Sequence, residues 1–409
     1  MECVARESSA KDNVAHASDV GAILRAASRG ERLEEAELVA LLECQGADLD
    51  ELLSAAGELR DRVKGRVVTY SPKVFLPITN LCRDRCSYCT FRKDPGQPGA
   101  WTMTPAEIAD WSRRGRELGC LEALMCLGDK PERAFKQYRQ TLSALGVKST
   151  IEYVGRACEL ALEAGLLPHT NAGVMSAEEL AFLRPLNVSM GLMLENVSVR
   201  LRGRGQVHQY APDKEPRLRL KMIEDAGRLR IPFTTGILLG IGETILERAQ
   251  SLLAIRHAHE RFGHIQEVII QNFRAKPETR MAEAPEPDAL EMARTIAAAR
   301  MALGGEMNLQ APPNLSPADV ELFLRAGIND FGGISPLTKD YVNPEAPWPH
   351  VARLAERCAA TGFLLKPRLA IYPEYISERW LSPNLMPIVE RLEQQLGQEG
   401  AGGRWRAMP

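Results

Sequence analysis

The chain has 409 residues, of which 45% are hydrophobic and 25% are charged. This composition is typical of a globular protein that buries its own core, and it argues against a disordered or fibrous chain. The 51 basic and 53 acidic residues nearly cancel. Without a large positive field the composition does not suggest a nucleic-acid partner, and a small molecule is the expected ligand.

The sequence shows no targeting or membrane segment. Its first twenty residues mix charged and polar side chains and lack the apolar stretch of a signal peptide. The uncharged run from Ile231 to Gly242 is too short to span a membrane. We therefore expect a cytoplasmic protein with no membrane partner.

Helical patterns come first in the chain. Apolar residues recur at three- and four-residue spacing after Asp19 and after Glu34, and a third short helix is expected near Leu52. We therefore expect residues 1–66 to form a helical N-terminal extension that packs against the rest of the protein. No catalytic chemistry is assigned to it.

From Lys73 onward, short β-branched runs alternate with helical patterns. The predicted strands are Val74–Thr79, Ala123–Leu127, Leu166–Asn171, Val188–Leu194, Phe233–Leu239, Glu267–Asn272, Met307–Gln310 and a short piece near Asp330–Phe331. The predicted helices are Pro105–Leu118, Ile151–Ala164, Ala177–Leu183, Leu218–Leu229, Ile245–Phe262, Ala289–Leu303 and Ala318–Ala326. This alternation predicts an α/β fold with parallel strands and right-handed crossovers, and eight strands favour a closed (β/α)8 TIM-type barrel. We assign residues 67–350 to the barrel and residues 351–409 to a C-terminal helix and tail that pack on it.

Three of the nine cysteines follow the first predicted strand. Cys82, Cys86 and Cys89 have a Cys-x3-Cys-x2-Cys spacing, which in a reducing compartment indicates metal binding rather than disulfide formation. Three thiolates on one loop can hold a cubane of four irons and leave one iron open, as a catalytic centre needs. A structural zinc site is the alternative. It needs a fourth ligand, for which the sequence offers only Cys120, Cys126 and distant histidines.

The cysteine loop, with Tyr88 before the third cysteine, resembles that of the radical S-adenosylmethionine (SAM) superfamily. The resemblance implies a radical SAM barrel with a [4Fe–4S] cluster on the three cysteines. It also implies that SAM chelates the open iron through its amino and carboxylate groups. Electron transfer from the reduced cluster then cleaves SAM to methionine and a 5′-deoxyadenosyl radical, which abstracts a hydrogen atom.

The same resemblance implies cofactor-binding roles for glycines and an acid at the ends of later strands. Gly128 and Asp129 match the glycine–acid element that meets the methionyl amino group of SAM. Gly236 and Gly240 match the element that backs the adenine, with Leu238 in place of isoleucine. Glycine lets the backbone come close to a ligand, and a carboxylate accepts hydrogen bonds from an ammonium.

Two further charged residues are candidates for SAM binding. Glu195 ends the fourth predicted strand and is suited to the amino group or the ribose of SAM. Arg219, in the helix that follows, is suited to the SAM carboxylate because arginine binds carboxylates in a bidentate way. Arg200 and Arg217 are rivals for that role.

Within the superfamily, residues 79–91 resemble the cluster loop of the 7,8-didemethyl-8-hydroxy-5-deazariboflavin (FO) synthases, the CofG family. Ser87 stands where a glycine is expected. Further segments resemble the same family, namely residues 168–171, 211–214, 234–244, 271–277 and 331–338. The resemblance covers the chain from Val74 to Pro349.

The family resemblance implies a lyase that starts from 5-amino-5-(4-hydroxybenzyl)-6-(D-ribitylimino)-5,6-dihydrouracil. Hydrogen abstraction, ring closure, loss of ammonia and oxidation give FO, a precursor of coenzyme F420, while SAM is cleaved to 5′-deoxyadenosine and methionine. A separate CofH-type enzyme supplies this adduct. The implied electron donor is a protein such as ferredoxin or flavodoxin.

Substrate-lining candidates lie at the ends of the third and sixth predicted strands, because the active site of such barrels lies at the carboxyl ends of the strands. These candidates are His169, Asn171, Gln271, Asn272 and Arg274. No residue is assigned as the general base. CofH-type coupling of tyrosine to an aminopyrimidine, or another radical SAM reaction, is an alternative. A non-catalytic metal-binding protein is an alternative from a different class.

Overall fold

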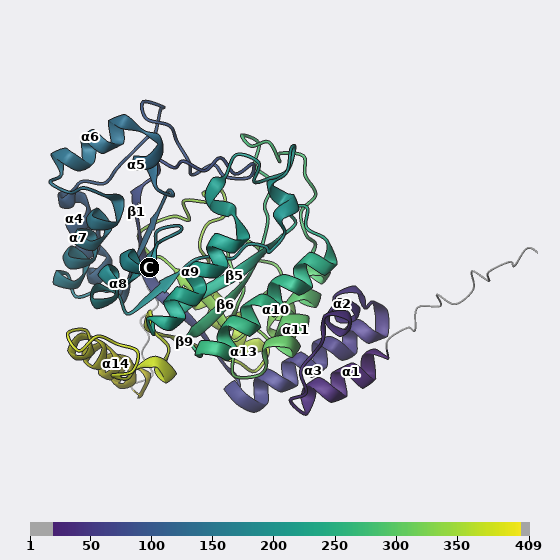
Figure 1. The fold of residues 1–409 in the computed structure, drawn as a ribbon. Coiled ribbons are helices and arrows are strands. Elements are labelled where there is room, and N and C mark those ends of the chain that lie inside the picture. The colour runs from purple at the N-terminus through teal and green to yellow at the C-terminus, as the bar shows by residue number, and fades with distance from the viewer. Residues whose placement is uncertain (1–18, 402–409) are drawn as a thin grey trace, which may run out of the picture.

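The computed structural model describes residues 19–401 and has at its centre a closed barrel of parallel strands (Figure 1). The strands are β1 (Val67–Thr79), β2 (Glu122–Leu127), β3 (Leu167–Asn171), β4 (Ser189–Gly191), β5 (Phe233–Leu239), β6 (Ile265–Asn272), β7 (Leu309–Gln310), β8 (Asp330–Ile334) and β9 (Leu364–Pro367). The first eight follow one another around the barrel, and β1 closes it by pairing with both β2 and β8. The predicted (β/α)8 fold is confirmed.

Most strands differ from their predicted lengths, and β1, β4 and β7 show why. β1 begins at Val67 rather than Val74, because its first residues pair with β9, which the sequence pattern did not indicate. β4 is shorter than predicted and is followed by Glu195, whose φ of 66° is left-handed, so the backbone there leaves the extended conformation. β7 consists of Leu309 and Gln310 alone.

Helices cover the outside of the barrel, and each helix predicted between the strands is present. They are α4 (Pro105–Glu117), α5 (Pro131–Ala134), α6 (Lys136–Ala144), α7 (Thr150–Glu163), α8 (Ala177–Leu183), α9 (Pro216–Arg228), α10 (Ile245–Phe262), α11 (Ala289–Leu303) and α12 (Val320–Arg325), with 3-10 turns η1 (Arg184–Leu186), η2 (Val199–Arg202) and η3 (Pro212–Lys214). Thr104 and Thr244 begin α4 and α10 with capping boxes, which satisfy otherwise unpaired N–H groups. Within residues 19–401, no helix is both long and apolar enough to cross a membrane.

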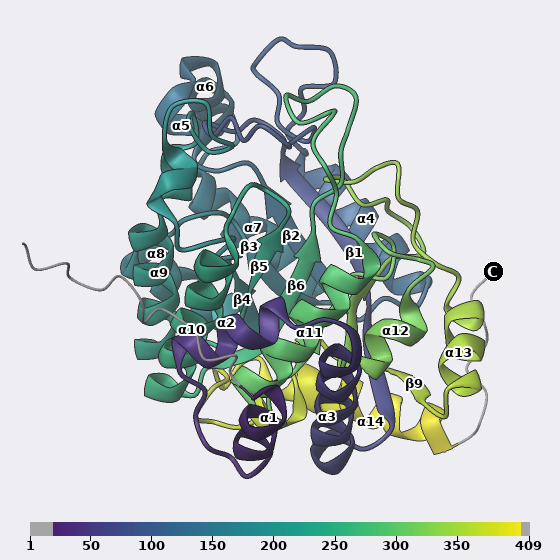
Figure 2. The same cartoon turned by 90° about the vertical axis from the view of Figure 1, so that its right-hand side faces the viewer.

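Three helices precede the barrel and pack on its outer helices. α1 (Val20–Ser28), α2 (Glu35–Glu43) and α3 (Gly46–Lys64) lie against α10 and α11 (Figure 2). Leucines of α2 and α3 are fully buried in this contact. Arg60 of α3 donates hydrogen bonds of 2.6 and 2.8 Å to the carbonyls of Leu324 and Ile328, which ties α3 to the end of α12. Residues 1–18 of the expected N-terminal extension lie outside the described residues.

The C-terminal segment closes the barrel at the end where the strands begin. After α13 (Val351–Ala360) and β9, the chain passes through η4 (Pro373–Tyr375) to α14 (Met386–Ala401), which lies away from the loops that follow the strands (Figures 1 and 2). The carbonyl of Ala370 accepts hydrogen bonds of 2.6 Å from Ser189 Oγ and 3.2 Å from Gln266 Nε2. The segment also forms an apolar cluster with Leu167 and Val188. The tail beyond residue 401, part of the expected C-terminal unit, is outside the described residues.

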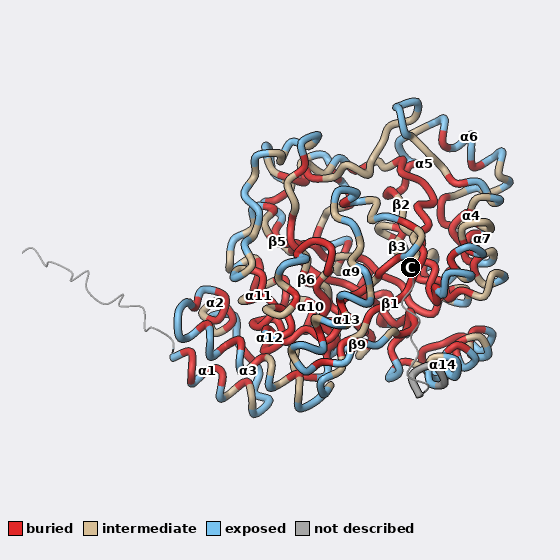
Figure 3. Tube along the Cα trace, turned by 180° about the vertical axis from the view of Figure 1, so that it is seen from behind, coloured by how far each residue is buried: buried red, intermediate tan, exposed pale blue. Residues whose placement is uncertain are grey.

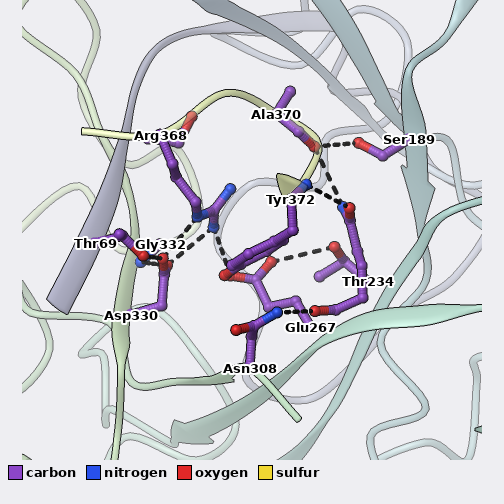
Figure 4. A network of polar contacts seen from close by, with 12 residues as sticks. Thr69, Ser189, Thr234, Glu267, Asn308, Asp330, Gly332, Arg368, Ala370 and Tyr372 are labelled. Atoms are coloured by element: carbon purple, nitrogen blue, oxygen red, sulfur yellow. Dashed lines mark hydrogen bonds and ion pairs between the residues drawn. The ribbon is translucent and has the colours of Figure 1, made fainter. Parts of the chain in front are cut away.

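Arg368, in this segment, occupies the floor of the barrel interior. Its guanidinium donates to both carboxylate oxygens of Asp330, at 2.6 and 2.9 Å, and to Glu267 at 2.7 Å (Figure 4). The ring of Tyr372 lies 4.2 Å from the guanidinium carbon, and its hydroxyl donates to Glu267. Figure 3 shows that the strands around this floor are buried. The network therefore holds buried charged groups that are paired with one another.

We predict that Arg368→Met destabilises the fold by about 3–5 kcal/mol, because it leaves Glu267 and Asp330 buried without their cation. Denaturant unfolding followed by circular dichroism measures the change in the free energy of unfolding. The matched control is Arg379→Met, since Arg379 is exposed. Equal stability of the two variants would show that the network does not hold the floor in place.

Candidate active site

Two adjoining cavities lie inside the barrel. The first, which we call the cysteine cavity, has a volume of about 290 Å³ and is lined by Cys82, Cys86 and Cys89. The second, which we call the barrel cavity, has a volume of about 240 Å³ and extends from the cysteine cavity toward the Arg368 floor. Six residues line both cavities: Cys126, Asn171, Met193, Gln271, Tyr341 and Val342. A ligand in one cavity can therefore touch a ligand in the other.

Alternate residues of the strands line the barrel cavity. Successive side chains of a strand point to opposite faces, so one residue in two points inward. The inward residues include Lys73 and Phe75 of β1, Glu122 of β2, His169 and Asn171 of β3, and Glu267 and Gln271 of β6. The sequence analysis named His169, Asn171 and Gln271 but missed the three charged residues. Glu267 lies four residues before Gln271 on the same strand, and this spacing was the signal that could have found it. Lys73 and Glu122 lie just before the strands predicted from the sequence, which gave no such signal.

Two predicted substrate-lining residues lie elsewhere. Asn272 follows Gln271 directly and therefore points to the opposite face of β6, where it is buried and lines neither cavity. Arg274 pairs with Glu286 at 3.0 Å and also lines neither cavity. The structure thus brings three of the five candidates together, because strand phase separates residues that are adjacent in sequence.

His169 presents a hydrogen-bond acceptor to the barrel cavity. Its Nδ1 lies 2.7 Å from Ser189 Oγ, and the hydroxyl of Ser189 donates to the carbonyl of Ala370. Nδ1 must therefore carry the proton that Ser189 accepts, which leaves Nε2 unprotonated. Burial lowers the pKa of His169 to about 4, so the imidazole is neutral near pH 7.

The cysteine loop packs tightly against the loop that follows β2. The backbone N–H of Asp129 donates to Cys82 Sγ at 3.1 Å. Gly128 is needed for this approach, because a Cβ at this position would lie 2.6 Å from Cys82 Cβ and overlap the carbonyl of Leu81. Burial raises the pKa of Cys86 to about 12, so this thiol stays protonated unless a bound cation compensates for the loss of water.

The spacing of the three sulfurs distinguishes between the two metal sites considered from the sequence. Sulfurs bound to one tetrahedral zinc lie about 3.8 Å apart, as follows from the Zn–S distance. In the described part of the chain, the one group of three His, Cys, Asp or Glu residues with ligand atoms all within 4.8 Å of one another is Asp84, Asp129 and Asp213. Because the three cysteines do not form such a group, at least one pair of their sulfurs lies more than 4.8 Å apart. They suit a larger cluster better than a single ion.

Two residues of opposite charge that line the cysteine cavity each have a buried polar atom without a partner. Asp129 accepts a hydrogen bond from Val174 at Oδ2, whereas its buried Oδ1 has no partner. Burial, with Asp213 and Asp84 nearby, raises the pKa of Asp129 to about 7. Arg219 donates to the carbonyl of Met193 at 2.8 Å, and its buried Nε has no partner. A zwitterionic amino acid carries the ammonium and the carboxylate that would satisfy these two groups.

The remaining charged candidates fall into those that line the cysteine cavity and those that do not. Glu195 lines the cysteine cavity and forms an ion pair with Lys214, a lining residue that the sequence analysis did not name. Arg200 is exposed and pairs with Glu247, and Arg217 is also exposed. Neither of these arginines lines the cysteine cavity, so Arg219 is the one of the three that does.

The remaining predicted cofactor-binding residues are Tyr88, Gly236 and Gly240, and each makes close packing contacts. Tyr88 lines the cysteine cavity, and its hydroxyl lies 3.0 Å from His208 Nε2. A Cβ at Gly236 would overlap the carbonyl oxygen of Ile269 and lie 2.8 Å from its Cβ, so glycine allows β5 and β6 to pack closely. Gly240 has a left-handed φ of 85° beside Pro287. Neither glycine lines a cavity, and their role toward adenine stays a prediction.

Comparison with known proteins adds the family. Residues 76–255 match the model of the radical SAM superfamily. The 7,8-didemethyl-8-hydroxy-5-deazariboflavin synthase of Methanothermobacter thermautotrophicus is 50% identical over 325 residues, which is 80% of this chain and 98% of that protein. The chain belongs to this synthase family.

Longer relatives and solved structures extend the comparison. The FO synthase of Streptomyces avermitilis is 48% identical over 90% of this chain but only 44% of its own length. The chain thus spans about half the length of such relatives. The [FeFe]-hydrogenase maturase HydG of Carboxydothermus hydrogenoformans is 17% identical and shares the fold, with a TM-score of 0.71 over 94% of this chain and 88% of that one.

The donor set of this deazaflavin synthase homologue fits the cofactors of its superfamily, which are a [4Fe–4S] cluster and SAM. The three cysteines line the cysteine cavity, and within residues 19–401 no fourth cysteine or histidine is close enough to complete a single-ion site with them. Asp129 and Arg219, which line the same cavity, have an unpaired carboxylate oxygen and an unpaired guanidinium nitrogen. Cys82, Cys86 and Cys89 therefore stay the predicted cluster ligands.

We predict that the protein reconstituted under anaerobic conditions binds about four irons and about four sulfides per chain. Cys86→Ala is expected to lose the cluster, because two thiolates do not hold it, whereas Cys120→Ala is expected to keep it. Cys120 is buried but lines neither cavity. Iron and sulfide analysis with visible absorbance measures both variants. A stoichiometric zinc content, or a full cluster in Cys86→Ala, would contradict the prediction.

We also predict that Arg219→Met weakens SAM binding roughly ten- to a hundredfold, since charge-assisted hydrogen bonds contribute about 1.5–3 kcal/mol. Equilibrium dialysis with labelled SAM on the reconstituted protein measures the dissociation constant. Arg217→Met is the control, and its affinity should match that of the wild type. If the exposed Arg217 variant loses affinity instead, the assignment of the arginine is wrong.

Proposed function

We propose that the chain converts 5-amino-5-(4-hydroxybenzyl)-6-(D-ribitylimino)-5,6-dihydrouracil into FO and ammonia, as a step in the biosynthesis of coenzyme F420. The observation that carries the proposal is the match to relatives of similar size. Two proteins named for FO formation, from Methanothermobacter thermautotrophicus and Methanopyrus kandleri, are covered over 98% and 99% of their lengths. The half-length match to a protein named FO synthase supports the same pathway.

In this proposal, side chains of the cysteine cavity hold the cofactors. Cys82, Cys86 and Cys89 hold the cluster, Asp129 takes the ammonium of SAM and Arg219 takes its carboxylate. When bound, the reduced cluster and SAM supply a 5′-deoxyadenosyl radical, which removes a hydrogen atom from the substrate. Apolar side chains around the cysteine loop, including Leu238 and Phe273, keep water away from that loop.

The substrate lies in the barrel cavity, with its reacting end at the junction of the two cavities. Asn171 and Gln271 line both cavities and offer hydrogen bonds at that junction. His169 Nε2 accepts a hydrogen bond from the polar part of the substrate. The low pKa of His169 suits it to this role better than to that of a strong base.

A loop after β8 shields the junction from water. Tyr341 and Val342 line both cavities, and Trp348 stacks on Phe75 with ring centroids 5.1 Å apart. The indole N–H of Trp348 donates to the carbonyl of Thr338 at 2.9 Å within the loop, and the backbone N–H of Phe75 donates to Thr338 Oγ1 at 3.0 Å, which joins the loop to β1. Exclusion of water protects a reactive substrate from side reactions.

The proposal includes two protein partners. The sequence contains a single Cys-x3-Cys-x2-Cys loop, so the CofH-type coupling that makes the adduct from tyrosine is assigned to a separate active site. Ferredoxin or flavodoxin supplies the electron.

We predict that the anaerobically reconstituted protein, with SAM and a reductant, forms FO, ammonia and 5′-deoxyadenosine from the hydroxybenzyl adduct. Mass spectrometry of the products and the absorbance of the deazaflavin measure this. Cys86→Ala is the inactive control. Coupling of tyrosine to the aminopyrimidine, in place of FO formation, would reassign the chain to the CofH-type reaction.

A further inference from the structure

Two consecutive glycines of β8 make room for two polar side chains of its neighbours. A Cβ at Gly332 would overlap the amide of Gln310 on β7, and one at Gly333 would overlap the aliphatic end of Lys73 on β1. Gly332 also has a left-handed φ of 69°, which glycine adopts without strain. Gln310 and Lys73 both line the barrel cavity, from the two strands that flank β8.

Lys73 forms one ion pair and keeps hydrogen-bond donors that are not used. Its Nζ lies 2.8 Å from Glu122 Oε1, and Glu122 also accepts a hydrogen bond from Ser71. An ammonium carries three N–H donors. Glu122 is the one residue in the described part of the chain that pairs with Lys73, and Lys73 lines the barrel cavity. Donor capacity is therefore left for a ligand.

Gln310 has no partner at all for its side chain among the described residues. It is 7% exposed and lines the barrel cavity. A nearly buried amide that makes no hydrogen bond costs free energy unless a ligand or water satisfies it. Arg368 and Glu267, in contrast, are already bonded to each other and to their neighbours (Figure 4).

We propose that Gln310 and Lys73 bind the carbonyl–NH–carbonyl edge of a pyrimidinedione ring. The amide oxygen of Gln310 accepts from the ring N–H, the amide nitrogen donates to one carbonyl, and the Lys73 ammonium donates to the other carbonyl. This inference rests on the proposed function, which supplies a substrate with that ring. It makes the pair a specificity-determining element of the barrel cavity.

The inference also orients the substrate. Gln310, Lys73 and Gly333 line the barrel cavity but not the cysteine cavity, whereas Asn171 and Gln271 line both. A ring held by Gln310 and Lys73 is therefore anchored away from the cysteines. The remainder of the molecule extends from this anchor to the junction, where the hydrogen atom is removed.

The experiment compares the binding of FO with that of its N3-methyl derivative, which lacks the ring N–H. Equilibrium dialysis against the reconstituted protein, with FO detected by fluorescence, measures both dissociation constants. The wild type is expected to prefer FO by at least about tenfold, because methylation leaves the Gln310 amide unpaired and adds a clash. In Gln310→Met the preference should be clearly smaller, since a side chain of similar volume has no amide and only the clash remains.

Lys73 has its own test. Lys73→Met is expected to weaken FO binding at least about tenfold. Because this substitution leaves Glu122 unpaired, a Lys73→Met/Glu122→Gln double variant removes both charges together. Gln140→Leu and Lys366→Met, both at exposed positions, are the matched controls and should bind FO like the wild type. Substrate-independent formation of 5′-deoxyadenosine and the melting temperature report whether each variant keeps its fold and cofactor site.

The outcomes separate the two proposals. If the wild type forms FO but binds FO and N3-methyl FO equally, the ring-edge inference is wrong and the proposed function stands. Retention of the wild-type preference in Gln310→Met also overturns the inference. If the wild type neither forms nor binds FO, both proposals fail.

Discussion

Alternate residues of a parallel strand point to opposite faces, and a closed barrel gives all the inward residues one shared interior. In this protein that interior is not purely apolar. Lys73, Glu122, His169, Glu267 and Gln310 all point into it from different strands. Buried polar groups are costly unless they are paired, so their pairing decides which are structural and which are open to a ligand.

The polar groups around Arg368 at the floor of the barrel are paired with one another and are therefore structural. Arg368 bonds to Asp330 and Glu267, and Tyr372 adds a hydroxyl and a ring. This arginine comes from the segment after β9, far along the chain from the strands that it joins. The C-terminal segment is thus part of the barrel, since it supplies the cation that two inward carboxylates require.

The upper half of the interior is open to ligands. Cys82, Cys86 and Cys89 meet the unpaired atoms of Asp129 and Arg219 around one cavity, and Asn171 and Gln271 link that cavity to the next. The tight contact between Gly128 and the cysteine loop brings the two loops together. A cofactor bound on the cysteine side and a substrate bound in the barrel would share one wall, as a reaction between them requires.

The sequence by itself determined the barrel and the cysteine loop. Strand and helix periodicity is local, and the three cysteines lie within one short loop, so both could be predicted without tertiary contacts. Adjacent inward and outward residues could not be told apart at the end of β6, where Gln271 lines the cavities and Asn272 does not. That Arg219 lines the cysteine cavity, whereas Arg200 and Arg217 do not, likewise became visible only in the tertiary structure. The tertiary structure also decided the pairing of Arg368 with Glu267 and the fit of Lys73 and Gln310 against two glycines. These contacts depend on which distant segments of the chain meet, and local periodicity carries no information about such meetings.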